Sequence, residues 1–393
     1  MKFDEALAWL YATEKFGIKL GLENTRRLLQ AAGSPERGLR ILHVAGTNGK
    51  GSVCAMCELT LRASGFRTGL YTSPHLVDFR ERIRIDGQLV SPDAVAEGLT
   101  LLREVSSDWD HSPTFFEIST VLALKCFAQE GCDFVVLETG MGGRLDATNA
   151  TQPSVSVITP IAMDHAEWLG DTIEKVASEK AGIIKPDVPV VSARQKPPAE
   201  AILRSRAAET GSPISFVGSP WPGPVGLAGS HQHENAALAV AALRACGADC
   251  TDQAIADGLR NVQWPGRFQR IGPRMILDGA HNPHAAATLR ETWRQEFGPA
   301  TATIVFGALG DKDYSEMLAL LTPIATRFLF VPIANPRAID PSAFLPLVPP
   351  GATCEPDVST ALRQALAHPA PILVTGSLFL VGEVLAQYSK AQG

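Results

Sequence analysis

The residues best suited to chemistry lie in one glycine-rich stretch, His43-Val44-Ala45-Gly46-Thr47-Asn48-Gly49-Lys50-Gly51-Ser52. An apolar run that predicts a buried strand leads into it, and a helical pattern follows. Backbone N–H groups in such a turn and at the start of a helix bind phosphate oxygens, and Lys50 would add a positive charge. The usual pattern G-x-x-x-x-G-K-[ST] is not met literally, because Val44 replaces its first glycine and the hydroxyl comes one residue late, at Ser52. A glycine turn with an unrelated lysine is the alternative, but the order strand, turn, helix favours phosphate binding.

Two further groups follow predicted strands. Glu138 ends the strand Phe134–Glu138, so its carboxylate emerges at the carboxyl end, where ligands bind in open α/β sheets. A carboxylate beside a phosphate loop is a suitable Mg²⁺ ligand, although it could simply cap a loop. His165 follows the strand Val155–Thr159 and has Asp164 beside it, a typical orienting partner for a metal-binding imidazole. A structural hydrogen bond is the alternative for this histidine.

Lys180 lies on the apolar side of a predicted helix, Asp171–Ile184. It is three and four residues from Ala177 and Val176, and therefore falls on their stripe at helical spacing. Its stem could pack there while the ammonium group reaches water. Burial would instead lower the pKa of the amine and make Lys180 a nucleophile.

The elements that must position these groups alternate between short β-branched runs and longer helical stretches. This pattern predicts an α/β fold with a mainly parallel sheet and helices on both faces. The capping hydroxyl, proline and acid of Ser91-Pro92-Asp93 predict a helix start. The other predicted elements of this part are strands Ile41–Ala45, Thr68–Tyr71 and Val188–Val191 and helices Thr114–Gln129, His231–Gly247 and one from Thr251.

A length of 393 residues predicts two domains. The Pro- and Gly-rich stretches Gly218–Gly229 and Trp264–Gly266 interrupt the pattern, and a fresh series of elements follows. We therefore expect a boundary near Gly272, with domains at residues 1–271 and 272–393. The second series comprises strands Met275–Asp278, Ala302–Phe306, Phe328–Val331 and Ile372–Val374 and helices Pro283–Phe297, Asp313–Ile324 and Leu378–Gln387.

The composition is that of a soluble globular protein, with 45% hydrophobic and 19% charged residues. A net charge of −6 gives no support for a nucleic-acid or anionic-membrane partner. No apolar run is long enough to span a bilayer, and the acidic N-terminus is unlike a secretory signal. Seven scattered cysteines predict free thiols and a cytoplasmic location. The pair Cys54 and Cys57 lies within a predicted helix without a second pair at zinc-like spacing, so we expect no metal or redox role there.

GTNGKGS, at residues 46–52, resembles the variant phosphate loop of the Mur ligase superfamily, in its folylpolyglutamate and dihydrofolate synthase branch. The likeness continues in the family's order over nearly the whole chain and includes GIKLGLEN at Gly17–Asn24. Individually some segments are weak, but together they are highly specific. The other matching segments are YTSPHLVDFRERIRIDG from Tyr71, TFFEISTVLAL from Thr114, LETGMGGRLDATN from Leu137, ITPIAMDHAEWLG from Ile158, EKAGIIK from Glu179, WPGRFQ from Trp264 and LDGAHNP from Leu277.

The resemblance implies a phosphate-loop ATPase-like N-terminal domain and a smaller, Rossmann-like C-terminal α/β domain. It implies ATP as co-substrate and two Mg²⁺ ions, with Lys180 carbamylated by CO₂ to supply an oxygen ligand to the second ion. The implied metal ligands are Ser52, Ser73, Glu138, His165 and Lys180. The implied catalytic residues are Lys50, His165, Lys180 and Arg267.

The same resemblance assigns the nucleotide and the folate. Besides Gly46, Thr47, Asn48, Gly49, Lys50, Gly51 and Ser52, it implies ATP contacts from Asn235 at the adenine, Arg267 at the phosphates and Asp278 at the ribose. A helix-capping amide, a surface arginine and a helix N-cap are the respective alternatives, and His281 receives no firm role. The implied folate residues are Thr114, Phe116, Leu145, Asp146 and Ala147. Phe116 offers a stacking face, and Asp146 could accept from the pterin's donor edge.

The expected chemistry is amide formation. ATP would phosphorylate a substrate carboxylate, and the amine of glutamate would attack the acyl phosphate. The segment RLDATN favours bifunctional members that make dihydrofolate from dihydropteroate and also extend tetrahydrofolate. We expect a monomer whose site lies in an interdomain cleft. The alternatives are chain extension only, a ligase of UDP-linked cell-wall precursors, and a phosphate-loop module without ligase activity. About forty residues before Gly46 are too few for the extra domain of the UDP-sugar ligases.

Overall fold

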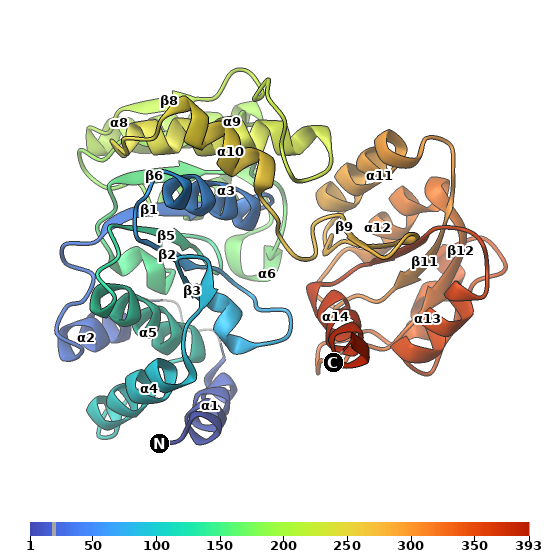
Figure 1. The fold of residues 1–393 in the computed structure, drawn as a ribbon, viewed down its shortest axis with the longest axis horizontal. Helices are drawn as coiled ribbons and strands as arrows, with labels where there is room; N and C mark the ends of the chain where they lie inside the picture. The colour runs from blue at the N-terminus through green and yellow to red at the C-terminus, as the bar shows by residue number, and fades with distance from the viewer. Residues whose placement is uncertain (18–20, 393) are drawn as a thin grey trace. The chain divides into compact units, whose positions relative to one another are not determined.

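The computed structural model describes residues 1–17 and 21–392, and the chain divides into two units (Figure 1). Residues 18–20 of the GIKLGLEN segment lie outside the described residues. The first unit comprises residues 1–74, 80–225 and 233–262, and the second comprises residues 75–79, 226–232 and 263–393. The boundary predicted near Gly272 stays a prediction, because each unit is made of separate stretches of chain.

The sheet of the first unit has the strand order β4-β3-β2-β5-β1-β6-β7-β8. From β2 to β8 every neighbouring pair is parallel, whereas β2–β3 and β3–β4 are antiparallel. The central strand β5 is buried along its whole length, as expected for a parallel sheet covered on both faces. The strands are β1 (Arg40–Ala45), β2 (Thr68–Tyr71), β3 (Ile83–Ile85), β4 (Gln88–Leu89), β5 (Phe134–Glu138), β6 (Val155–Ile158), β7 (Val190–Ser192) and β8 (Ile214–Phe216).

Helices cover both faces of this sheet, as two neighbouring residues of β2 demonstrate. The hydroxyl of Thr68 donates to Glu58 of α3 at 2.8 Å, whereas a Cβ at the next residue, Gly69, would lie 2.6 Å from the Phe127 ring of α5. Successive strand residues point to opposite faces, so α3 and α5 lie on opposite sides. The helices up to Asn261 are α1 (Phe3–Ala12), η1 (Thr13–Phe16), α2 (Glu23–Ala31), α3 (Lys50–Ala63), η2 (Phe79–Arg82), α4 (Pro92–Ser106), α5 (Phe115–Gln129), η3 (Ala147–Ala150), α6 (Ala166–Leu169), α7 (Ile173–Ala181), α8 (Pro197–Thr210), α9 (Ser230–Ala245) and α10 (Asp252–Asn261).

The second unit repeats the α/β plan with the strand order β13-β12-β11-β14-β10-β9, in which only the β9–β10 pair is antiparallel among the described residues. The strands are β9 (Gln269–Ile271), β10 (Met275–Leu277), β11 (Ala302–Phe306), β12 (Ala325–Phe330), β13 (Thr353–Cys354) and β14 (Ile372–Thr375). The helices are α11 (Pro283–Phe297), α12 (Tyr314–Leu321), η4 (Thr322–Ile324), η5 (Pro341–Leu347), α13 (Val358–Leu366) and α14 (Leu378–Gln392).

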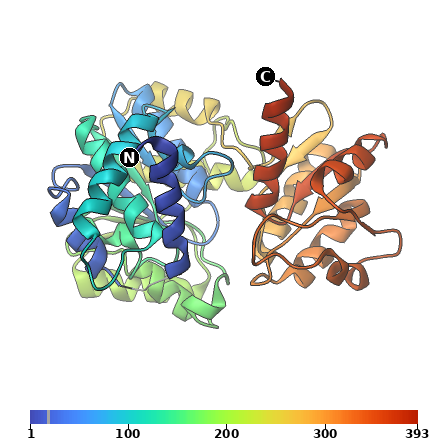
Figure 2. The same cartoon turned by 90° about the horizontal axis from the view of Figure 1, so that it is seen from below.

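Alternation along the strands of the second unit divides its core into two layers. Ile304 and Phe306 of β11 pack with α11 and α12, whereas Val305 between them packs with α13 and α14. Figure 1 shows these two helix pairs on either side of the sheet, and Figure 2 shows the chain ending in α14. The predicted α/β class with mainly parallel sheets and helices on both faces is therefore confirmed.

Several predicted elements have the observed bounds, among them β2, β5, α11 and β11. Ser91 caps α4 as predicted, by accepting from the N–H of Ala94. The helix predicted at Asp171–Ile184 is shorter, because Thr172 caps α7 and the helix ends before Gly182. The helix predicted at Asp313–Ile324 changes to a 3₁₀ turn at Thr322–Ile324, where Pro323 cannot donate an α-helical hydrogen bond. In the described part of the chain, no helix is both long and apolar enough to cross a membrane.

Candidate active site

The glycine-rich turn joins β1 to α3, so the predicted order strand, turn, helix is confirmed. Gly46 and Gly49 have φ angles of +146° and +90°. A Cβ at Gly46 would lie 1.9 Å from the Thr159 hydroxyl oxygen, and one at Gly49 would lie 2.7 Å from Oδ1 of Asn235. Both positions therefore require glycine, for backbone conformation and for space.

Helix α3 begins without a side-chain cap. Its N-cap is Gly49, which is in the left-handed conformation and has no side chain that could cap the helix. The first N–H groups of a helix have no partner inside it and carry the positive end of the helix dipole. This end of α3 is therefore suited to an anion, as the sequence predicted.

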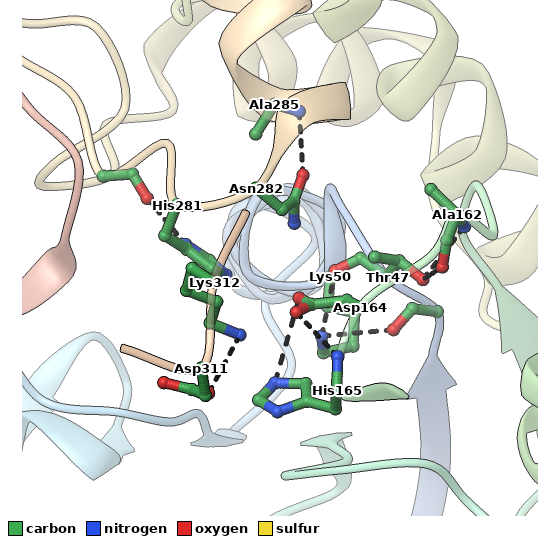
Figure 3. Close-up of polar contacts among 12 residues, drawn as sticks. Thr47, Lys50, Ala162, Asp164, His165, His281, Asn282, Ala285, Asp311 and Lys312 are labelled. Carbon is green, nitrogen blue, oxygen red and sulfur yellow. Dashed lines mark hydrogen bonds and ion pairs between the residues drawn. The ribbon is translucent and has the colours of Figure 1, made fainter. Parts of the chain in front are cut away.

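The turn is fastened to the loop that follows β6. The N–H groups of Thr47 and Asn48 donate to the carbonyl of Pro160, at 3.0 and 3.4 Å. The Thr47 hydroxyl donates to the carbonyl of Ala162 at 2.9 Å and accepts from the Ala162 N–H at 3.0 Å, a pair visible in Figure 3. The phosphate loop and the loop leading to His165 thus hold each other in place.

Gln195, which the sequence did not single out, fixes the start of that second loop. Its Oε1 accepts from the N–H of Ile161 at 3.0 Å, and its Nε2 donates to the carbonyl of Thr159 and to the hydroxyl of Ser192, both at 3.1 Å. Gln195 follows β7, the neighbour of β6 in the sheet. A polar residue just after a predicted strand was the available signal.

Two lysines converge on one carbonyl of the phosphate loop. Lys50 donates to the carbonyls of Gly46 and Thr47, each at 3.2 Å, and Lys180 donates to the same Gly46 carbonyl at 2.8 Å. Lys180 is only 4% exposed, as its place on the apolar stripe predicted. Burial, together with the nearby charge of Lys50, lowers the pKa of Lys180 from 10.5 to about 7. A large fraction of this amine is therefore neutral near neutral pH.

The carboxylate Glu138 lies at the end of β5 and is buried. Its Oε2 accepts from the N–H of Ser73, in the loop after β2, at 3.0 Å. Strands β2 and β5 are adjacent and parallel, so both residues come from the same edge of the sheet. Ser52 is buried in the first turn of α3. The structure thus brings Glu138 and Ser73 together.

His165 has a φ angle of +52° and immediately precedes the short helix α6. Asp164 lies beside it: Oδ1 of Asp164 accepts from the backbone N–H of His165 at 2.9 Å, and Oδ2 lies 3.8 Å from the His165 Nε2 (Figure 3). This carboxylate–histidine pair was expected from the sequence. Among the described residues, no three His, Cys, Asp or Glu side chains gather as a metal site would require. A metal bound here would need hydroxyl, phosphate or carbamate oxygens as well.

Asp146, one of the residues implied for the folate, is buried. Its Oδ2 accepts from the N–H of Met141 at 2.9 Å, and its Oδ1 accepts from the N–H and hydroxyl of Thr148. Burial raises the pKa of Asp146, while these hydrogen bonds oppose that shift. Ala147 begins η3 next to Asp146 and is buried, and Leu145 is half-buried.

Thr114 and Phe116 lie at the start of α5. Thr114 is the N-cap in a reciprocal capping box with Glu117, so its hydroxyl already has a structural role. Phe116 packs against the Tyr71 ring with centroids 5.9 Å apart, and its ring lies where a Cβ on Gly140 would meet it at 2.5 Å. These two residues therefore shape the wall beside Gly140.

Of the three residues expected at the nucleotide's other groups, Asn235 belongs to the first unit. It is buried in α9 with its amide against Gly49, in contact with the phosphate loop. In the second unit, Asp278 accepts from the N–H groups of Phe268 and Ala280, at 2.8 and 2.9 Å. Burial raises the pKa of Asp278, and the charge of Arg267 partly opposes this. Asp278 therefore links the loop after β10 to the residue before β9 and does not cap α11.

The remaining expectations concern Arg267, His281 and the cysteine pair. Arg267 is half-buried and donates to the carbonyl of Gly266 at 3.1 Å. His281 donates from Nδ1 to the carbonyl of Gly279 at 2.8 Å (Figure 3). Cys54 and Cys57 are fully buried in α3, and burial raises the pKa of both thiols well above the usual value. Both are therefore unreactive packing residues in this state.

Comparisons with known proteins identify the family. Two family models match, described as the Mur ligase middle domain, at residues 44–218, and the Mur ligase glutamate ligase domain, at residues 266–378. The dihydrofolate synthase/folylpolyglutamate synthase of Bacillus subtilis is 36% identical, over 86% of this chain and 86% of the relative. The chain spans about half the length of two haloarchaeal relatives that it also matches.

Solved structures agree over nearly the whole chain. The Escherichia coli FolC structure in complex with DHPP and ADP has a TM-score of 0.90 and 33% identity, over 99% of this chain and 98% of that one. A bifunctional folylpolyglutamate synthase/dihydrofolate synthase from Yersinia pestis, complexed with AMPPNP and a Mn ion, has the same TM-score, identity and coverage. The chain belongs to the Mur ligase family, in its folylpolyglutamate synthase and dihydrofolate synthase branch.

Proposed function

We propose that this protein is an ATP-dependent ligase that joins the amino group of L-glutamate to the carboxylate of a folate-type substrate. Its substrates are dihydropteroate, which it converts to dihydrofolate, and tetrahydrofolate, to which it adds further glutamates. The observation that carries this proposal is the uncapped start of α3 beside Gly46, with Lys50 and Lys180 both directed at the Gly46 carbonyl. The dipole of α3, the N–H groups at its start and the charge of Lys50 together favour binding of a nucleoside triphosphate.

The reaction has two steps. The carboxylate of the substrate attacks the γ-phosphorus of ATP, which gives an acyl phosphate and ADP. The neutral amine of glutamate then attacks the acyl carbon, and the tetrahedral intermediate releases inorganic phosphate and a proton as the amide forms. The protein positions the reactants and neutralises developing charge, chiefly through Lys50 and Arg267.

The donor set of the first unit fits a divalent metal, and we propose two Mg²⁺ ions. The hydroxyls of Ser52 and Ser73, the carboxylate of Glu138 and the imidazole of His165 are ligands of suitable type. Glu138 uses one lone pair of Oε2 for the Ser73 N–H and keeps others for a cation. Bound Mg²⁺ would neutralise charge on the nucleotide phosphates.

We propose that Lys180 is carbamylated and so completes this donor set. A nucleophilic attack on CO₂ requires the neutral amine, which burial favours at this position. The reaction replaces an N–H with a negatively charged N–COO⁻ group and releases a proton. The carbamate would also remove the repulsion between two ammonium groups at the Gly46 carbonyl. Intact-mass measurement in bicarbonate buffer and a high-resolution map together test this step, and unmodified lysine by both in the active, nucleotide-bound protein would refute it.

The other assignments follow from the same proposal. Residues Gly46–Ser52 and Asn235 bind ATP, with Arg267 at the phosphates and Asp278 at the ribose. Asp146, Phe116 and the neighbouring Thr114, Leu145 and Ala147 bind the pterin. Residues 1–271 form the ATP- and folate-binding domain, and residues 272–393 form the glutamate ligase domain. We propose that the active species is a monomer.

ADP release tests the function directly. Purified protein is incubated with ATP, Mg²⁺, bicarbonate and glutamate, with dihydropteroate in one reaction and tetrahydrofolate in another. We expect both substrates to stimulate ADP release and expect the products to carry one more glutamate by mass. Omission of glutamate is the control, because a phosphate-loop module without ligase activity would release ADP equally without it. Stimulation by tetrahydrofolate alone would restrict the protein to chain extension, and no stimulation by either would refute the proposal.

A further inference from the structure

His43 is a fully buried histidine to which the proposed reaction gives no role. It lies in β1, between β5 and β6, and its backbone is in register with Leu137. Leu137 is also in register with Tyr71, whose hydroxyl bonds to Ser119 of α5. Residues in register on parallel strands point to the same face, so His43 points to the α5 side of the sheet.

The imidazole of His43 is linked to the carboxylate of Asp146, proposed to bind the pterin, through the hydroxyl of Thr148. Its Nε2 lies 2.8 Å from the hydroxyl oxygen of Thr148, which is itself fully buried. The same hydroxyl donates to Oδ1 of Asp146 at 2.5 Å, and the Thr148 N–H donates to that oxygen at 3.0 Å. His43, Thr148 and Asp146 therefore form a continuous hydrogen-bonded chain inside the first unit.

The hydrogens available along this hydrogen-bonded chain determine which ring nitrogen of His43 carries its proton. A threonine hydroxyl has one hydrogen, and in Thr148 that hydrogen goes to the Asp146 carboxylate, which only accepts. The Thr148 oxygen must therefore accept from His43, so the proton of the imidazole is on Nε2. Nδ1 is left as a bare acceptor, and within the described residues it has no hydrogen-bond partner.

The same geometry keeps His43 neutral. A second proton on Nδ1 would place an unpaired N–H and a positive charge in a site with no solvent exposure, which is costly. Burial and the nearby charge of Lys185 accordingly lower the pKa of His43 to about 3. His43 is thus a fixed, neutral donor at neutral pH.

We propose that His43 is a positioning residue that orients the Asp146 carboxylate for the pterin by fixing the Thr148 hydroxyl. Without a donor at Nε2, the hydroxyl could rotate toward another acceptor and leave Oδ1 of Asp146 with one hydrogen bond fewer. The carboxylate would then be free to turn from the orientation that Met141 and Thr148 impose. This inference rests on the proposed function, because it assigns Asp146 to the folate.

Two substitutions at His43 test whether the Nε2–H donor itself is needed, because both remove the imidazole ring and only one keeps a donor near the Nε2 position. In His43→Gln the terminal amide places an N–H near the Nε2 position. In His43→Asn the shorter amide reaches only the Nδ1 position, which has no partner here. We expect the Gln variant to keep the KM for dihydropteroate within about threefold of wild type, and the Asn variant to raise it about tenfold, the effect of one hydrogen bond. The KM for ATP should be unchanged in both.

Thr148 gives a second matched pair. Thr148→Ser keeps the hydroxyl and should behave like wild type, whereas Thr148→Val removes it and should raise the KM for dihydropteroate at least as much as His43→Asn. If His43 had a purely structural role, the His43→Gln and His43→Asn variants would be impaired alike, and the KM for dihydropteroate and the KM for ATP would change together. That outcome would overturn the proposal.

The wild-type protein provides a test that needs no activity. ¹⁵N NMR of histidine-labelled protein, with the His43 signal assigned by its loss in His43→Gln, should show the Nε2–H tautomer and no titration between about pH 6 and pH 8. An Nδ1–H tautomer or a titrating signal would overturn the proposal. If wild type showed no dihydropteroate-dependent ADP release, the proposed function would fail, while this spectrum would still decide whether the His43–Thr148–Asp146 chain exists.

Discussion

The loops after β1 and after β10 each join a parallel strand to a helix through a turn. They differ in whether a side chain of the loop caps the first N–H groups of that helix. After β1, the N-cap of α3 is Gly49, which has no side chain that could cap the helix. After β10, Asn282 caps α11 by accepting from the N–H of Ala285, and Pro283 removes one N–H from the first turn. Asp278 also accepts from the N–H of Ala280 in this loop and from the N–H of Phe268, just before β9.

This difference separates a helix start without a capping side chain from a helix start that the chain closes itself. The end of α11 satisfies its own donors, so its residues contribute to the fold even without a bound molecule. The start of α3 has no capping side chain of its own, and the turn before it is held by contacts of Thr47 with Pro160 and Ala162. Substitutions in the glycine turn before α3 should therefore change activity more than stability, whereas substitution of the α11 N-cap should change stability more than activity.

The largest effect should come from Gly46→Ala. The added Cβ collides with Thr159, so the loop must shift, and a displacement of about 1 Å in an active site can cost roughly a hundredfold in rate. We expect at least this loss in ADP release. Gly131→Ala is the matched control, because Gly131 also has a positive φ, +63°, but has nothing within 4 Å of the added Cβ. Equal activity in the two variants would contradict the role given to the phosphate loop.

Lys180→Met should also lose activity by about a hundredfold or more, because it keeps the apolar stem but removes the group proposed to become a carbamate.

The same substitution should change how the stability of the protein depends on pH. The pKa of Lys180 is lowered in the folded state, so between about pH 7 and pH 10 the unfolded chain binds more protons and stability from this group rises with pH. Urea unfolding at several pH values should show a slope of at most about 1.4 kcal/mol per pH unit that Lys180→Met removes.

That slope is a property of the unmodified lysine. Measurements should therefore be made without bicarbonate, and mass spectrometry should verify the free amine. A slope identical in wild type and Lys180→Met would show that the ammonium group is not destabilised by burial.

Gln195→Ala should have an intermediate effect. It removes the hydrogen bonds to Thr159 and Ile161, which fix the loop that holds the Thr47 and Asn48 N–H groups. We expect the KM for ATP to rise about tenfold, with the KM for glutamate unchanged. Gln253→Ala is the control, since the side chain of Gln253 donates within α10, to Asp257, and has no other hydrogen-bond partner among the described residues. If nucleotide titration by calorimetry gave the same affinity for both variants, Gln195 would have no positioning role.

The smallest effect on activity should come from Asn282→Ala. Loss of the N-cap hydrogen bond should destabilise the protein by about 1 kcal/mol in thermal or urea unfolding. The KM for ATP should change by less than about twofold, because α11 closes its own end. Asn282→Asp is the matched control, because it retains an accepting oxygen. An Asn282→Ala variant with normal stability and impaired nucleotide binding would reverse the contrast between the two loops.

Much of the fold could be predicted because local residues encode it. Thr114 and Glu117 form the capping box that begins α5, and Asn282 with Pro283 begins α11 at the predicted residue. The predicted helix ends were less accurate where a tertiary contact or a capping residue inside the predicted helix set the observed end, as Thr172 does for α7. Short edge strands such as β4 and β13 were not predicted, since two exposed residues carry no periodic signal.

The sequence alone determined the order strand, glycine turn and helix and the place of Lys180 on an apolar helix stripe, because glycine spacing and helical periodicity are properties of neighbouring residues. The tertiary structure alone decided that Lys180 meets the carbonyl of Gly46, that Gln195 braces the loop after β6, and that His43 reaches Asp146 through Thr148. These partners come from separate strands and helices, and the strand order that places β1 between β5 and β6 brings them together. Such contacts depend on the packing of the whole sheet, which no local pattern of residues specifies.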